Sequence, residues 1–128
     1  MSQNSSRDVA DLQGIWDQVL LEADGISNPP DELGATGTVA TFSGNHFTAH
    51  TTEGVLLLEG TFTLDASLTP KAINWFDSIG PDKGKQLPGI YRLEGDHFIF
   101  ITADEGAPRP TIFRTGRGQT KRSFVRRR

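Results

Sequence analysis

Short runs of alternating apolar and polar residues, separated by glycine-containing turns, constrain the fold of this chain more than any other feature. In residues 55–64, Leu56, Leu58, Phe62 and Leu64 share one parity and are expected to face the core, while the glutamate and threonines take the other. Such a period of two places one set on each face of a β-strand. Turn sequences such as Ser43-Gly44-Asn45 and Glu94-Gly95-Asp96 supply the positive φ that a tight hairpin needs. No segment has a convincing helical period, so the pattern predicts an all-β protein.

The turns divide the chain into nine predicted strands. They are residues 14–23, 36–42, 46–52, 55–64, 71–76, 89–93, 97–102, 110–115 and 119–125. Consecutive hairpins favour an up-and-down order, and closure at about eight strands removes both unpaired edges. We therefore expect one domain over residues 11–128, a small antiparallel up-and-down β-barrel of about eight or nine strands. Residues 1–10 are polar and predict a flexible arm or one helical turn, and the proline-containing loop 27–32 is placed over one barrel mouth.

Composition narrows the chemistry. The chain of 128 residues has no cysteine, which excludes a disulfide, a thiolate nucleophile and a thiolate metal site. His46 and His50 lie about 13 Å apart along one strand, too far to share a metal ion. We therefore predict neither a metal nor a cofactor. No apolar stretch is long enough to span a membrane and no signal peptide is evident, so the sequence predicts a soluble, cytoplasmic protein, a monomer or homodimer.

The charge is distributed unevenly. All 16 acidic residues lie at or before Glu105, whereas the last 20 residues are rich in arginine. This basic end can bind phosphate or an acidic surface, or it can pair with acidic residues of the first strand. We favour the pairing. Few aromatic residues alternate with the basic ones, which makes nucleic acid an unlikely partner.

The segment Gly14-Ile15-Trp16 resembles the Gly-x-Trp start of lipocalins and related calycins. The resemblance implies that Trp16 plugs the closed end of the barrel and that a basic residue of the last strand covers its ring. Arg122 and Arg126 are the candidates for this closure.

Longer blocks extend the resemblance over residues 12–114. The blocks at residues 12–16, 60–65, 70–73, 80–85, 89–96 and 109–113 are similar to an uncharacterised bacterial lipocalin-like family first noticed in planctomycetes. The family implies a barrel but no particular activity. This chain departs from it at Asn74, where the family usually has aspartate, and it lacks the cysteine often found after the Gly95-Asp96 position.

Candidate ligand-binding residues are those expected inside the barrel. Trp75, Tyr91, Phe62 and Phe100 offer aromatic surface, and Arg114 offers a guanidinium for a ligand carboxylate. The alternative is that the aromatic residues only fill the core and that Arg114 is solvated.

The leading functional hypothesis is a barrel that binds a small, largely apolar molecule in its interior. A second is a cofactor-independent isomerase, cyclase or lyase acting by general acid–base chemistry in the same pocket. Its catalytic candidates are Tyr91, His50, Asn74 and Asp77. A third is an interaction module that uses the basic C-terminal strand. The first two hypotheses both require a cavity inside the barrel, and a barrel packed solid by side chains would leave no room for the ligand.

Overall fold

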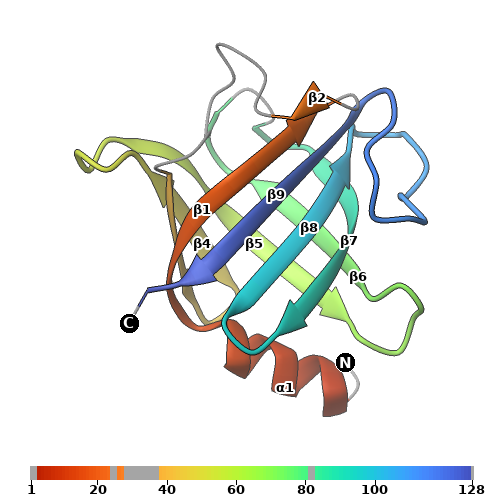
Figure 1. The fold of residues 1–128 in the computed structure, drawn as a ribbon, viewed down its shortest axis with the longest axis horizontal. Coiled ribbons are helices and arrows are strands. Elements are labelled where there is room, and N and C mark those ends of the chain that lie inside the picture. Colours follow the sequence, from red (N-terminus) through yellow and green to blue (C-terminus); the bar gives the residue numbers. More distant parts are fainter. Residues whose placement is uncertain (1–2, 24–25, 28–37, 81–82, 128) are drawn as a thin grey trace.

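The computed structural model describes residues 3–23, 26–27, 38–80 and 83–127. One helix, α1 (Gln3–Leu12), precedes the strands. The strands are β1 (Gly14–Ala23), β2 (Ile26–Ser27), β3 (Val39–Ser43), β4 (His46–His50), β5 (Leu56–Asp65), β6 (Ala72–Asp77), β7 (Gln86–Glu94), β8 (His97–Ala103) and β9 (Gln119–Arg126). All neighbours are antiparallel, and β1 also pairs with β9 (Figure 1). The eight strands β1 and β3–β9 thus form a closed up-and-down barrel, which confirms the predicted fold class.

Glycines at two kinds of position permit this barrel. Gly44 and Gly95 have φ of 62° and 58° in the β3–β4 and β7–β8 turns, as their sequences indicated. Gly60 on β5 serves a different purpose, because a Cβ there would lie 2.1 Å from the carbonyl oxygen of Phe76. Only glycine allows β5 and β6 to approach this closely.

The amino-terminal segment differs from the expected flexible arm, because it forms the ten-residue helix α1. Its inner face contains Ser5, Asp8 and Leu12, all buried, and the Ser5 hydroxyl oxygen accepts a hydrogen bond from the Ala66 amide at 2.8 Å. The spacing of these three residues is helical, but two of them are polar. A search for apolar periodicity therefore missed the helix. No helix in the described part of the chain is long and apolar enough to cross a membrane.

The prediction of a strand at residues 110–115 was wrong. β8 pairs directly with β9, so no strand can lie between them in the barrel. The connection between them lies outside β6 and β7, where Arg109 donates hydrogen bonds to the carbonyls of Ile73 and Gly89 at 3.0 and 2.8 Å. The Arg92 guanidinium lies 4.5 Å from the centre of the Phe113 ring. Side-chain contacts thus hold this segment against the barrel, where we expected the backbone hydrogen bonds of a β-strand.

Two other expectations concern β5 and the proline-containing loop. Leu56 was expected to face the core but is 43% exposed, since the β4–β5 register shifts between Ala49 and His50 and changes the alternation. The predicted loop over the barrel mouth lies almost wholly outside the described residues.

One end of the barrel is closed by Trp16 and α1. The indole N–H of Trp16 donates a hydrogen bond to the Leu12 carbonyl at 2.7 Å, and the Arg126 guanidinium lies 4.3 Å from the centre of its ring. Arg126 also donates to the carbonyls of Asp11 and Gln13, two acceptors at the C-terminal end of α1. Arg126 therefore joins β9, Trp16 and the helix, whereas Arg122 lies elsewhere.

The basic carboxyl end is engaged with the rest of the chain. Arg127 forms an ion pair with Asp17 on β1, and Arg126 forms one with Asp96 at 3.2 Å. The pairing with Asp17 is the contact with the first strand that the charge distribution favoured.

Candidate functional site

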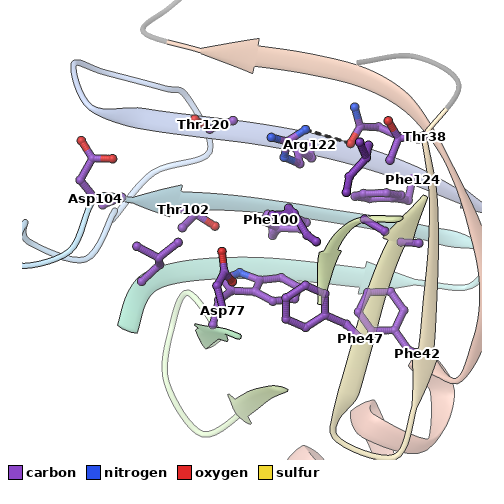
Figure 2. A pocket seen from close by; sticks show the side chains of 18 residues that line it. Thr38, Phe42, Phe47, Asp77, Phe100, Thr102, Asp104, Thr120, Arg122 and Phe124 are labelled. Atoms are coloured by element: carbon purple, nitrogen blue, oxygen red, sulfur yellow. Dashed lines mark hydrogen bonds between the residues drawn. The ribbon is translucent and has the colours of Figure 1, made fainter. Parts of the chain in front are cut away.

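A cavity of about 300 Å³ occupies the end of the barrel opposite α1. The helix contacts Ala66 after β5 and Lys71 before β6, whereas the cavity is lined by Asp77 at the far end of β6. Asp104 and Thr120, at the ends of β8 and β9 on that side, also line it (Figure 2). The aromatic core between the cavity and the helix is closely packed. The barrel thus has one filled half and one hollow half.

Aromatic rings form much of the cavity wall. They belong to Phe42, Phe47, Trp75, Phe100 and Phe124. The Trp75 ring centre lies 4.7 Å from that of Phe100 and 5.0 Å from that of Phe47, and Phe100 stacks on Phe124 at 5.9 Å. Inward positions on five different strands therefore supply a continuous apolar surface.

A polar pair interrupts this apolar wall. Arg122 on β9 donates a hydrogen bond from Nη1 to the Oε1 atom of Gln18 on β1, at 3.2 Å (Figure 2). Because a guanidinium only donates, the contact requires the amide oxygen of Gln18 to point at Arg122. The amide nitrogen of Gln18 is thereby directed elsewhere.

Three buried polar atoms have no hydrogen-bond partner among the described residues. They are the Nε2 atom of Gln18, the Nε1 atom of Trp75 and the Oγ1 atom of Thr102. All three belong to side chains of the cavity wall. Gln18 is 2% exposed and Trp75 is 6% exposed, so these two side chains are withdrawn from bulk solvent. Native proteins leave few such atoms, and a cluster around one cavity calls for a functional explanation.

Asp77 adds a carboxylate to the same wall. It is 8% exposed, lies at the end of β6, and points into the space between the strands (Figure 2). Its backbone oxygen accepts a hydrogen bond from the Gly84 amide at 2.8 Å, which fixes the strand end. With Arg122 and Asp104, the cavity wall thus contains one guanidinium and two carboxylates.

The predicted ligand-binding residues separate into two groups. Trp75 and Phe100 line the cavity. Phe62 lies in the packed core, where its ring is 5.9 Å from that of Trp75. Tyr91 lies at the closed end and Arg114 is exposed, and neither belongs to the cavity wall.

The predicted catalytic residues do not converge. Asp77 is the only one of the four on the cavity wall. Asn74 lies on the outer face of β6, where its amide bonds Thr63 at 3.2 Å and accepts from Arg109 at 2.6 Å. His50, half-buried at the end of β4, is not among the lining residues.

Tyr91 has a structural partner. Its hydroxyl donates a 2.6 Å hydrogen bond to the Asp8 carboxylate, which also accepts from Lys71 at 2.9 Å. Burial, followed by the bond to Asp8 and its negative charge, raises the pKa of Tyr91 far above its ordinary value. The phenol is therefore held neutral and fastens α1 to the barrel.

Sequence reasoning missed six polar residues of the cavity wall. They are Gln18, Thr38, Thr102, Asp104, Thr120 and Arg122. Strand parity was a usable signal, since Gln18 lies two residues after Trp16 and Thr102 two after Phe100. For Arg122 the resemblance implied closure of the barrel instead, and threonine and serine occur at both parities of most strands, so their parity did not decide which face they take.

Comparisons of the chain with protein-family models, curated proteins and solved structures each returned no match. In the described part of the chain, no group of three histidine, cysteine or acidic side chains could hold a metal ion.

Proposed function

We propose that the open half of the barrel binds a small, largely apolar molecule. The observation that carries this proposal is the cavity of about 300 Å³ with its aromatic wall. Ligand pockets for drug-sized molecules span about 300–1,000 Å³ and combine apolar walls with a few polar groups. The volume here is at the lower end of that range, which favours a compact ligand.

We also propose that the chain belongs with the lipocalin-like barrels. The position of Trp16 at the closed end, covered by Arg126 of the last strand, supports this relationship. In such an architecture the closed end provides stability and the other end receives the ligand.

Filling the cavity tests the binding proposal. Ala49 lines the cavity and its neighbour Thr48 has the opposite strand parity, so Ala49→Phe and Thr48→Phe add the same ring to opposite faces of β4. We expect Ala49→Phe to weaken binding of the fluorescent probe N-phenyl-1-naphthylamine about 10-fold or more, by taking up its volume. Thr48→Phe is the matched control and should bind as the wild type does. Equal binding by the Ala49→Phe protein would place the probe elsewhere and contradict the proposal.

The natural ligand is accessible to native mass spectrometry of the protein purified from its own host. We expect a bound molecule that the Ala49→Phe variant lacks and the Thr48→Phe variant retains. A molecule retained equally by both variants would bind outside the cavity.

Asp77 supports a second candidate function, proton transfer on the bound molecule. A buried carboxylate beside a ligand is suited to act as a general base, and the donors of Gln18 and Arg122 could stabilise negative charge on a substrate oxygen. Asp77→Asn keeps the shape and removes the base. Under this hypothesis the variant still binds the molecule identified above but no longer converts it; unchanged conversion would eliminate Asp77 as the base.

A further inference from the structure

The three unpartnered polar atoms have a definite arrangement around the barrel. Gln18 is on β1, Trp75 on β6 and Thr102 on β8. In the ring of eight strands, β1 and β6 are four strands apart in either direction. Gln18 and Trp75 therefore lie on opposite walls of the cavity, with Thr102 between them on the side of β8.

Both opposed atoms are hydrogen-bond donors. An indole N–H donates only, and the amide nitrogen of Gln18 donates because its oxygen already accepts from Arg122. Thr102 can donate as well. The cavity wall thus has unpartnered donors on two opposite strands, β1 and β6.

The surface between these donors restricts the shape of the occupant. The rings of Trp75, Phe100 and Phe124 follow one another at 4.7 and 5.9 Å along this side of the cavity. Flat conjugated rings pack well against such a surface in offset or edge-to-face geometry. A row of aromatic faces with a donor at each end favours a planar molecule with an acceptor at each end.

Charge also discriminates between ligand classes. Asp77 contributes a buried carboxylate to the wall and Asp104 an exposed one at its rim, against the one guanidinium of Arg122. The Nη1 atom of that guanidinium is engaged with Gln18. This balance favours neutral carbonyl oxygens over the carboxylate group of an anionic ligand.

We propose that the occupant is a neutral, flat, conjugated ring compound with carbonyl-type acceptor oxygens at two opposite edges, as in a quinone. This inference rests on the proposed binding function and specifies its ligand class. The donors are sealed from solvent, so small movements of the wall side chains accompany binding.

Probes that share one two-ring skeleton and differ in the number of carbonyl acceptors test the proposal. 1,4-Naphthoquinone has two opposed carbonyl oxygens, 1-tetralone has one, and naphthalene has none. Calorimetric titration should rank their affinities in that order, with about a 10-fold gain for each hydrogen bond. The absence of cysteine removes thiol addition of the quinone as a competing reaction.

Two substitutions remove the donors individually. Gln18→Glu retains an oxygen for Arg122 but replaces the donating nitrogen by an acceptor, and Trp75→Phe removes the indole N–H. Each should reduce the preference for naphthoquinone over naphthalene about 10-fold. The ratio of affinities within one variant cancels changes in cavity volume. Thr102→Val, which preserves side-chain shape, provides a third test if another variant does not fold, and Thr61→Val on the outer face is the control.

The outcomes separate the two proposals. Equal affinity for naphthoquinone and naphthalene, or a preference that survives both donor substitutions, would overturn the ligand class while the binding function stands. If none of the three probes binds and N-phenyl-1-naphthylamine does not bind either, the binding function itself fails.

Discussion

Tyr91 is the only tyrosine of the chain, and the structure predicts that it does not ionise while the protein is folded. Tyr91→Phe removes the 2.6 Å bond to Asp8 but leaves the ring volume and the bond from Lys71 to Asp8. A hydrogen bond to a charged group contributes about 1.5–3 kcal/mol, so we expect a loss of about 2 kcal/mol. For a domain of this length that lowers Tm by about 8 °C.

The pH dependence has a definite sign. The pKa of Tyr91 is raised in the folded state, so its contribution to stability is complete below the unfolded value of about 10 and declines as the pH rises above it. The difference in stability between wild type and Tyr91→Phe should therefore shrink above pH 10. Absorbance at about 295 nm reports tyrosinate from this one residue, and circular dichroism reports folding. Tyrosinate formation near pH 10 in a protein that is still folded would refute the assignment of Tyr91 to a buried structural contact.

Three further predictions concern other contacts. Thr102→Val removes a buried hydroxyl without a described partner and should stabilise the ligand-free protein by about 1 kcal/mol. Urea denaturation measures this change, with Thr61→Val as the control. A loss of stability would show that the hydroxyl has a hydrogen-bond partner. Arg126→Lys keeps the charge but loses the planar contact with Trp16 and part of the hydrogen bonding to α1. The free energy of unfolding should fall by about 2 kcal/mol, and the amides of α1 should be the first to lose protection from hydrogen exchange. Thr115→Val removes the hydroxyl bond, the larger of the two Thr115 bonds that lower the pKa of Glu22, and keeps the backbone N–H bond. The titration of that carboxyl, followed by NMR, should therefore move upward, and the stability it adds should be lost at higher pH as the solution is acidified; an unchanged titration would contradict the hydroxyl contact.

The barrel was predictable from the sequence because period-two patterning and turn chemistry agreed. β1 has the predicted bounds, and the turns at Gly44 and Gly95 define the register of their hairpins. The strand predicted at residues 110–115 failed for a different reason. Its threonine, isoleucine and phenylalanine have strand propensity, but closure of the barrel by β8 and β9 excludes a ninth member.

The site was less predictable because it depends on which inward positions remain unfilled. Trp75 and Phe62 share the property of being inward-facing aromatic residues, yet only Trp75 reaches the cavity. The difference is their height along the barrel, which depends on the stagger of the strands and on α1 at one end. The position of a residue along the barrel axis depends on the tertiary structure, and the sequence pattern within one strand does not predict it. Asp77 was among the candidates because it follows Trp75 where a predicted strand ends, and the structure places it on the cavity wall.

The two ends of the barrel treat buried polar groups in opposite ways. At the closed end the Trp16 indole, the Tyr91 hydroxyl and the Asp8 carboxylate each have a partner at 2.6–2.9 Å. At the open end the corresponding groups of Trp75 and Gln18 have none among the described residues. The same chain can satisfy a buried indole, so the orphaned one is not a limit of the fold. An unsatisfied buried donor costs about 1–3 kcal/mol, and a protein retains that cost where binding gives the donor a partner. The contrast between Trp16 and Trp75 therefore adds a second, independent argument for the proposal that the hollow half of this barrel binds a ligand.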